Sequence, residues 1–327
     1  RLYAAVFTNV VCFDAAYGTT VAQFSPLSQQ MRVLWIAVEG DTLYALGRVV
    51  QAGNTNSEIA AYNTVASTTV WRYSYAGFID PRMTAMAGGN LYFYTGSRQA
   101  GCLRTASGAL GWLVQDTSPL SGSTWSLVNY ASSICTSNAF YVFPKENSRV
   151  VAYAATDGHV LWQTNRFSDW WLLVDGKLRT QGSLAFDATS GAQSTVPSFS
   201  GSICGHYSGS PEAFYSQSGR AFDRTKNVRV LTIGDNNGMV KSGCGSGNYV
   251  ADGLFLSFPH SCWCTYEARG YVAQCPETNA AAVMREQGPR VEVGAGGTGV
   301  GTPLPVDNLD WWTYRANNAR SGSTAAT

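Results

Sequence analysis

Cysteines are the side chains in this sequence with the widest choice of chemistry, because a thiol can act as a nucleophile, a metal ligand or half of a disulfide. Four of the eight, Cys244, Cys262, Cys264 and Cys275, lie close together, and Cys204 precedes them. Cys262 and Cys264 have one residue between them, whereas zinc sites usually place two to four. We therefore predict at least one disulfide in this cluster. Cys244 pairs with Cys262 or Cys264, and the remaining thiol pairs with Cys204 or Cys275.

Histidines are few, and the sequence contains only His159, His206 and His260. A metal site built from Cys204, His206, His260 and Cys264 is the alternative to the disulfides. No spacing suggests a Ser-His-Asp triad. His159 follows a turn glycine and is expected to be exposed. We predict no catalytic residues and no metal site.

Acidic residues could hold a cation, but their positions favour turns. Asp14, Asp187 and Asp223 each follow a short apolar run, where a carboxylate caps a tight turn. The run 235–238 (Asp-Asn-Asn-Gly) resembles the start of a calcium loop but lacks its later acidic ligands. The glycines of 294–301 match G-x-G-x-x-G, but Pro303 and Pro305 follow where a phosphate-binding helix would have to begin. We interpret 288–305 as a linker or surface connection.

Two tryptophan pairs, Trp170-Trp171 and Trp311-Trp312, could stack on sugar rings or bases. Paired aromatics can equally anchor the edges of sheets, and in a chain with ten tryptophans we favour that role. Trp170 and Trp171 remain the candidates for an aromatic binding surface.

A repeated phrase gives the elements that would position these groups: an apolar strand, a small residue, an aromatic residue or Leu, then Asp or a substitute. Gly follows four residues later, and often Trp four beyond that. The Asp position is occupied by Asp14, Asn63, Arg104, Ala154, Asp187 and Asp223, at intervals of 49, 41, 50, 33 and 36 residues. A degenerate seventh copy covers 270–273.

These intervals are close to one four-stranded propeller blade, roughly 40 to 50 residues. Side chains that alternate along each strand would fill layers between sheets, and the Trp would pack between neighbouring blades. We predict an all-β propeller of seven or eight four-stranded blades over 1–287. Residues 306–327 would open a next blade or close the first. The one segment with helical character is 279–286.

The repeat also interprets two further cysteines. Cys12 and Cys102 occupy the small-residue position that is Ala61, Ala152 and Ala185 in other copies. We expect both thiols to be buried and unpaired.

Composition limits the function classes. Charged residues make up 13% and the net charge is +1, so the sequence has no basic surface for nucleic acid. No apolar run reaches the roughly 20 residues of a membrane span. The chain starts at Arg1 in strand-like sequence, which we interpret as a processed piece of a longer chain. The disulfides predict an extracytoplasmic location: periplasmic, cell-surface or secreted.

The repeated phrase resembles the quinoprotein-like (PQQ-like) β-propeller repeat. The run 241–264, with its Pro-His-x-Cys-x-Cys phrase, and the run 310–315 (Asp-Trp-Trp-Thr-Tyr-Arg) resemble PQQ-binding-like proteins of planctomycete-type bacteria. In enzymes of this class the resemblance implies PQQ with calcium, a catalytic Asp and often adjacent paired cysteines. This chain has no Cys-Cys pair.

We therefore expect a non-catalytic scaffold or interaction protein within a larger polypeptide or assembly, with other protein chains or domains as partners and no cofactor. The alternatives are a PQQ-dependent oxidoreductase and a carbohydrate-binding propeller that uses Trp170 and Trp171. We also expect a terminal blade to be completed by strands from elsewhere, because an open ring leaves strand edges unpaired.

Overall fold

The computed structural model describes residues 1–28, 31–51, 54–118, 132–144, 149–165, 171–180, 182–196, 208–209, 213–216, 220–224, 228–232, 249–251, 254–257 and 272–274. The regular elements of these residues are all strands, which confirms the all-β prediction. The chain divides into two compact units, Arg1–Gln274 and Cys275–Thr327. The second unit lies outside the described residues, as do the predicted helical segment, the linker and the start of the last segment.

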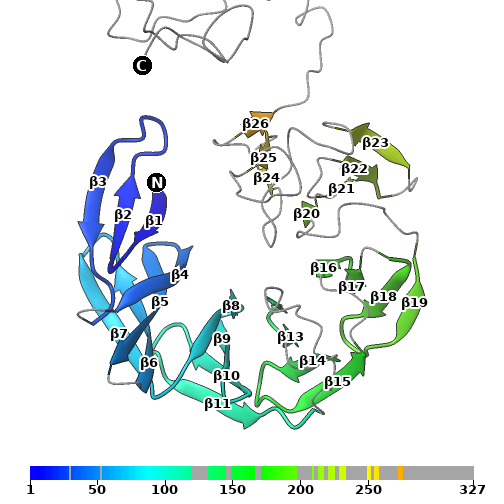
Figure 1. The fold of residues 1–327 in the computed structure, drawn as a ribbon, viewed down its shortest axis with the longest axis horizontal. Coiled ribbons are helices and arrows are strands. Elements are labelled where there is room, and N and C mark those ends of the chain that lie inside the picture. Colours follow the sequence, from blue (N-terminus) through cyan, green and yellow to red (C-terminus); the bar gives the residue numbers. More distant parts are fainter. Residues whose placement is uncertain are drawn as a thin grey trace, which may run out of the picture. The chain divides into compact units, whose positions relative to one another are not determined.

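Seven antiparallel sheets make up the described part of the first unit (Figure 1). The first sheet contains β1 (Leu2–Val6), β2 (Asn9–Phe13) and β3 (Thr20–Phe24). The second contains β4 (Arg32–Glu39), β5 (Thr42–Gln51), β6 (Asn54–Asn63) and β7 (Thr68–Tyr75). The third contains β8 (Ile79–Ala87), β9 (Asn90–Thr95), β10 (Gln99–Arg104) and β11 (Leu110–Gln115). The fourth contains β12 (Ser132–Cys135), β13 (Ala139–Phe143), β14 (Arg149–Ala154) and β15 (Val160–Asn165).

The fifth sheet contains β16 (Trp171–Val174), β17 (Lys177–Thr180), β18 (Leu184–Asp187) and β19 (Gln193–Thr195). The sixth contains β20 (Ser208–Gly209), β21 (Ala213–Tyr215), β22 (Arg220–Asp223) and β23 (Arg229–Thr232), and the seventh contains β24 (Tyr249–Ala251), β25 (Leu254–Ser257) and β26 (Val272–Gln274). Each strand pairs with the next along the chain, so every sheet is a simple meander. The predicted β-propeller architecture is confirmed.

The predicted repeat positions coincide in the structure. The Asp position closes the third strand of each four-stranded sheet, at Asn63, Arg104, Ala154, Asp187 and Asp223. In the first sheet Asp14 follows β2, and Cys12 lies opposite Tyr3 as Cys102 lies opposite Tyr92. The strands β1, β2 and β3 therefore correspond to the second, third and fourth strands of the repeat.

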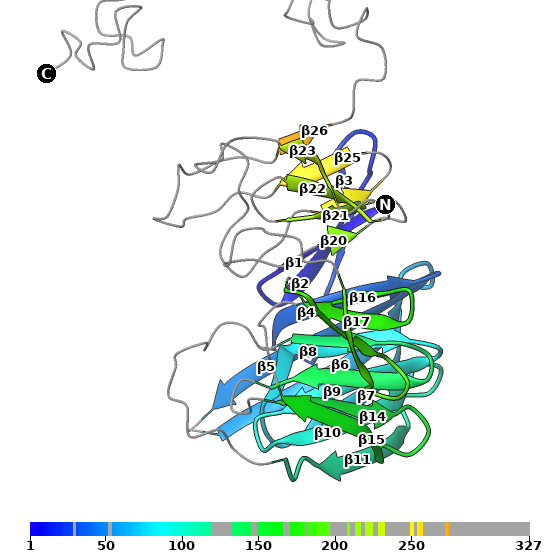
Figure 2. The ribbon, with the colours of Figure 1, turned by 90° about the vertical axis from the view of Figure 1, so that its right-hand side faces the viewer.

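The core lies between successive sheets rather than within one. In the second to fifth sheets, which Figure 2 shows from the side, one face packs against the next sheet along the chain and is called the front face, and the other, the rear face, packs against the preceding sheet. Between the second and third sheets, the front-face residues Tyr44, Leu46 and Trp71 pack against the rear-face residues Leu91 and Leu103. Because successive side chains of a strand point to opposite faces, one strand contributes side chains to the interfaces with both neighbouring sheets. The same arrangement recurs between the third and fourth sheets and between the fourth and fifth.

Candidate functional site

The turn after the third strand of the repeat, which we call the repeat turn, has the same pair of backbone hydrogen bonds in the third, fourth and fifth sheets. In the fourth sheet the amide of Ala154 donates to the carbonyl of His159, and the amide of Gly158 donates to the carbonyl of Ala154. Arg104 with Gly108 and Asp187 with Gly191 form the same pair of bonds. Where the first residue is Asp187, its Oδ1 also accepts bonds from the amides of Thr189 and Ser190. The predicted turn role of this acid is confirmed.

A tryptophan from the preceding sheet covers each of three repeat turns; we call Trp71, Trp112 and Trp162 the inter-sheet tryptophans. Their indole N–H groups donate to the carbonyl oxygens of Thr105, Ala155 and Ala188, at 2.7, 3.0 and 3.0 Å. Each carbonyl belongs to the residue just after the Asp position of the next sheet. The predicted packing of Trp between blades is confirmed.

The glycine of these turns meets two requirements. Gly158 has φ +77°, a conformation that L side chains rarely adopt. A Cβ at Gly158 would also lie 2.5 Å from Cε3 of Trp112. The indole face therefore lies directly on the glycine backbone, which leaves no room for a side chain.

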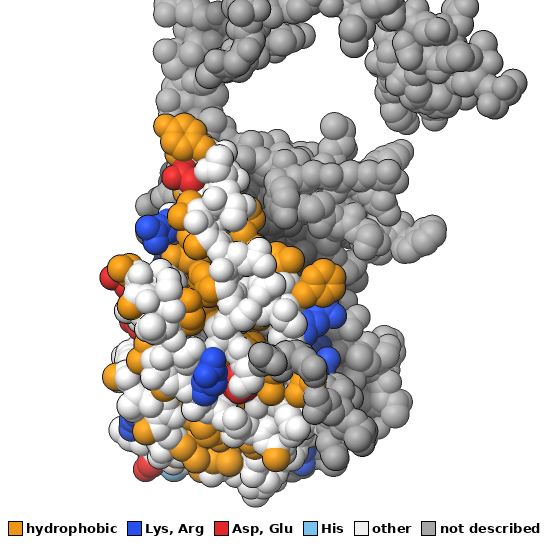
Figure 3. Space-filling view, turned by 90° about the vertical axis from the view of Figure 1, so that its left-hand side faces the viewer, with side chains coloured by type: hydrophobic (Ala, Val, Ile, Leu, Met, Phe, Trp, Pro, Cys, Tyr) orange, Lys and Arg blue, Asp and Glu red, His pale blue; other side chains and the backbone are white. Residues whose placement is uncertain are grey.

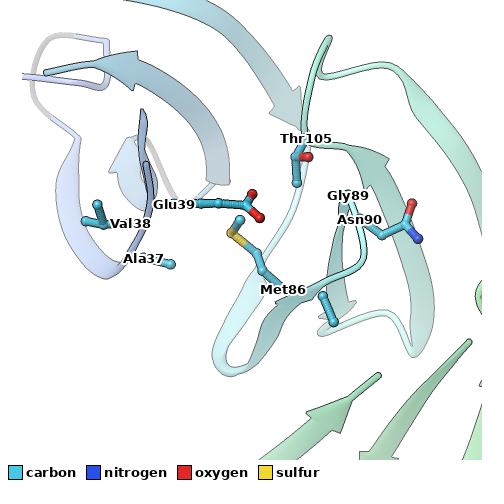
Figure 4. Close-up of a pocket in the computed structure, with 8 residues that line it drawn as sticks. Ala37, Val38, Glu39, Met86, Gly89, Asn90 and Thr105 are labelled. Atoms are coloured by element: carbon cyan, nitrogen blue, oxygen red, sulfur yellow. The ribbon is translucent and has the colours of Figure 1, made fainter. Parts of the chain in front are cut away.

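A small cavity of about 290 Å³ lies between the second and third sheets (Figure 4). Glu39, at the end of β4, directs its carboxylate between Met86 and Thr105, whereas the amide of Asn90 points away from it (Figure 4). Thr105 also lines the cavity, and its carbonyl accepts the indole N–H of Trp71. The cavity therefore lies over an inter-sheet tryptophan contact.

The chemistry of this cavity favours binding over catalysis. Burial raises the pKa of the nearby Tyr44, and the negative charge of Glu39 raises it further, against a lowering bond with Thr105. The amide oxygen of Asn90 accepts a bond from Arg104, and its nitrogen donates to Tyr92. The cavity thus presents the carboxylate of Glu39 beside a mixed polar and apolar lining that includes Thr105 and Met86, and a carboxylate can accept charge-assisted hydrogen bonds from a cationic group.

Sequence reasoning missed this cavity. Its walls come from two repeat units, and Glu39 occurs at this position in one sheet alone among those described. The one available signal was the pair of turns Gly40-Asp41 and Gly88-Gly89, which connect the first two strands of the second and third sheets.

A buried polar cluster follows β11. Asp116 is 3% exposed, and its carboxylate accepts bonds from the Tyr94 hydroxyl at 2.6 Å and the Ser118 amide at 2.9 Å. Arg98 lies 3.8 Å from the same carboxylate. Burial raises the pKa of Tyr94, as do its bond to Asp116 and the negative charge there. We assign this cluster a structural role, fixing the chain where it leaves the third sheet.

The three described thiols are unpaired, and two of them are buried. Cys12 and Cys102 are free and buried, which confirms the sequence prediction, and Cys135 is free and half-buried. Burial raises the pKa of Cys102 to about 11 and that of Cys135 to about 12. Since the thiolate is the nucleophilic form, neither side chain suits catalysis at neutral pH.

The remaining predicted site residues divide into two groups. Trp171 is 5% exposed and packs against Phe143 and Phe186, with ring centroids 5.1 and 5.6 Å away. It therefore anchors the fifth sheet, and its ring is not available at a binding surface. The others lie outside the described residues: Trp170, His206, His260, Cys204, Cys244, Cys262, Cys264 and Cys275. The predicted disulfides stay predictions.

The described residues do not fit a quinone with calcium. His159 is exposed, as predicted, and contacts Asp157 at 2.6 Å. The carboxylates of Asp14 and Asp187 accept hydrogen bonds from backbone amides of their own turns. The carboxylate of Asp116 accepts hydrogen bonds from the hydroxyl groups of Tyr94 and Ser118. Within the described ranges, no three acidic, histidine or cysteine side chains gather into a metal-binding group. The prediction that the protein uses no cofactor stays a prediction.

Exposed apolar side chains concentrate in two places. One lies on the outer strands, one or two residues before an inter-sheet tryptophan: Val70, Leu110, Val160 and Leu161. The other is the first sheet with its turns: Leu2, Val6, Phe7, Tyr17 and Val21. Figure 3 shows one side of the molecule, where hydrophobic side chains are exposed among few charged ones. In the part of the chain that is described, no helix is long and apolar enough to cross a membrane.

Comparisons with known proteins agree with this geometry. The solved structure of BamB from Moraxella catarrhalis superposes with a TM-score of 0.51 and 14% identity, over 79% of this chain and 92% of that one. The computationally designed Ika8 protein gives a TM-score of 0.58 and 8% identity, over 84% of this chain and 80% of that one. At these identities the likeness concerns the fold alone.

No curated protein matches the chain by sequence at a significant level. The sequence profile of one family, described as outer membrane protein assembly factor BamB, matches residues 6–165 and 55–207. The two matches overlap and together cover more than half of the chain. The chain therefore belongs to this BamB-type family of PQQ-like β-propeller repeat proteins.

Proposed function

We propose that this protein is a non-catalytic propeller scaffold that acts outside the cytoplasm and binds other protein chains or domains of a larger assembly. The family description names an assembly factor, which supports a role in bringing proteins together. The planctomycete-type subfamily remains part of the proposal, since its Pro-His-x-Cys-x-Cys phrase lies outside the described residues.

The observation that carries this proposal is the row of exposed aliphatic side chains on the outer strands. Val70, Leu110, Val160 and Leu161 are between 40% and 53% exposed, on three successive sheets. Outer strands are edge strands, and an edge with apolar side chains is a site where another chain can add. Apolar residues at similar places in successive repeats give a partner a continuous line of contact.

Several groups that could have served catalysis are used by the fold. Asp187 caps its turn, Asp116 holds a buried cluster, and burial raises the pKa of the Cys102 and Cys135 thiols. The second candidate, a PQQ-dependent oxidoreductase, would need a binding set outside the described residues. A carbohydrate surface would depend on Trp170, because the ring of Trp171 is buried.

Site-specific photo-crosslinking tests the proposal in cells of the source organism. A photoreactive amino acid at Leu110 is expected to give one discrete crosslinked protein, identified by mass spectrometry. The matched control places it at Ser190, an exposed turn residue of the fifth sheet. Equal, diffuse crosslinking from both positions would contradict the scaffold role. Stoichiometric binding of PQQ with calcium to purified protein, read by quinone absorbance, would favour the oxidoreductase.

A further inference from the structure

The two glutamates in the described part of the chain have opposite surroundings. The carboxylate of Glu58 is buried, accepts hydrogen bonds from the amide and the hydroxyl of Ser28, and lies 3.5 Å from Nε of Arg72. Among the described residues, the carboxylate of Glu39 has neither a hydrogen-bond donor nor a cationic partner. It points instead into the cavity between the second and third sheets (Figure 4). The fold therefore uses one glutamate and leaves the other free to meet a ligand.

The walls of this cavity are held in place by hydrogen bonds within the protein. Glu39 lies opposite Thr42 in the hairpin of β4 and β5. On the other wall, the amide of Thr105 donates to the carbonyl of Gly89 at 3.0 Å. The bond from the indole of Trp71 to the carbonyl of Thr105 joins the second sheet to the third. A site that is formed before its ligand arrives loses little conformational entropy on binding.

The size and lining of the cavity suit one long side chain. Its volume of about 290 Å³ is at the lower end of the roughly 300 to 1,000 Å³ of small-molecule pockets, so a large cofactor would not fit. Ala37, Met86 and Ala87 offer apolar surface to a methylene stem, and Glu39 and Thr105 offer oxygen acceptors to its end. Arginine and lysine combine such a stem with a polar, charged end.

The charge in the cavity selects a cation. Glu39 is the one charged side chain among the described lining residues. The amide of Asn90 points away and is bonded to Arg104 and Tyr92, so Arg104 does not neutralise Glu39. A carboxylate in a partly enclosed site favours charge-assisted bonds from an ammonium or guanidinium group.

We propose that this cavity binds one basic side chain, arginine or lysine, presented by a partner protein chain. The inference rests on the scaffold role proposed above and gives the chemistry of one contact. Val38, which is 44% exposed, adds an apolar contact at the cavity. The cavity lies on β4 and β8, the first strands of their sheets, whereas Val70 and Leu110 lie on the last strands. The two contacts are therefore separate and can be tested separately.

Met86 reports on the cavity directly. Labelling the full chain with methyl-¹³C methionine gives one NMR signal for each of five methionines, and Met86→Leu assigns the cavity signal. The probes are N-acetyl-arginine amide, N-acetyl-lysine amide and the uncharged N-acetyl-citrulline amide. A cationic probe should shift the Met86 signal saturably, and citrulline should bind at least about tenfold more weakly. The tighter of the two cations identifies the side chain.

Glu39→Gln should raise the dissociation constant of the cationic probe by about tenfold. The matched control, Asp157→Asn, removes an exposed carboxylate from the fourth sheet and should leave that constant unchanged. The signal of Met83, which is buried in the same strand as Met86, should not move. A shift without saturation, an equal response to citrulline, or equal effects of the two variants would overturn the proposal.

Ala37→Leu keeps the test decisive if Glu39→Gln disturbs the fold. The larger side chain fills the cavity and retains the carboxylate, so it should also weaken the cationic probe by about tenfold, and normal binding would overturn the proposal. The titration needs no cellular partner. A negative titration with a discrete crosslink from Leu110 would overturn the cavity assignment alone. A positive titration without that crosslink would support the cavity and contradict the outer-strand contact alone.

Discussion

The first sheet and the third sheet carry nearly the same repeat but differ in burial. In the third sheet Leu91 and Tyr92 are fully buried, with one neighbouring sheet on each face. In the first sheet the front-face residue Val10 is buried against the second sheet, whereas Leu2 on the rear face is exposed. One repeat thus forms half of a core, and the other half comes from its neighbour. The stability of a blade therefore resides in its interfaces, as expected for repeat proteins.

Among the interface residues, we expect the inter-sheet tryptophans to contribute most to the free energy of unfolding. Trp112→Ala removes a buried ring from the core between the third and fourth sheets, and it leaves the carbonyl of Ala155 without the indole bond. We expect a loss of about 4 kcal/mol in the free energy of unfolding, measured by denaturant titration.

Trp112→Phe is the matched control, since it keeps most of the ring and loses the N–H bond. It should cost clearly less than the alanine variant. A loss below about 1 kcal/mol for Trp112→Ala would contradict the claim that stability resides between the sheets.

The next prediction compares a glycine that an indole covers, Gly158, with a glycine in open space, Gly176. Gly158→Ala combines an unfavourable φ of +77° with a clash against Trp112, so we expect a loss of about 3 kcal/mol. Gly176, with φ +67° and open space around its Cβ position, isolates the backbone effect. Gly176→Ala should cost about 1 kcal/mol in the same titration. Equal losses would mean that the indole does not determine the glycine.

Asp187 makes one repeat turn sensitive to pH. Amide and hydroxyl bonds from Ser190 lower the pKa of this carboxyl below its ordinary value, with help from Thr189 and the charge of Lys177. A carboxyl with a lowered folded-state pKa adds stability above its unfolded pKa, and this is lost as the pH falls through the folded pKa. Asp187→Ala should therefore destabilise the protein at neutral pH and have little effect in strong acid. Melting curves across this range test the claim, and a loss that does not depend on pH would contradict it.

Ser67 gives the smallest expected effect. Ser67→Gly removes the strain of a serine with positive φ, but it also increases the conformational entropy of the unfolded chain. We therefore expect the free energy of unfolding to rise by about 0.5 kcal/mol at most. The same substitution combined with Ala22→Trp should recreate an inter-sheet contact between the first and second sheets. A thermal shift larger than the two separate effects would support it, and a purely additive shift would argue against it.

The sequence by itself determined the repeat unit. Strand alternation, Asp or Asn at Asn63 and Asp187, and glycine four residues later are local requirements of a strand and its turn. They therefore appear in the order of residues, and the small-residue position correctly predicted that Cys12 and Cys102 would be buried and free. The tryptophan spacing likewise predicted packing between blades.

Only the tertiary structure decided what lies across each interface. The cavity beside Glu39, the burial of Trp171 and the exposure of Leu2 depend on which two sheets meet, and residues from separate repeats have no fixed spacing along the chain. The reason that Gly158 cannot carry a side chain is the ring of Trp112, 46 residues earlier in the chain. Local pattern defines a strand and a turn, but burial is a property of the pair of surfaces that come together.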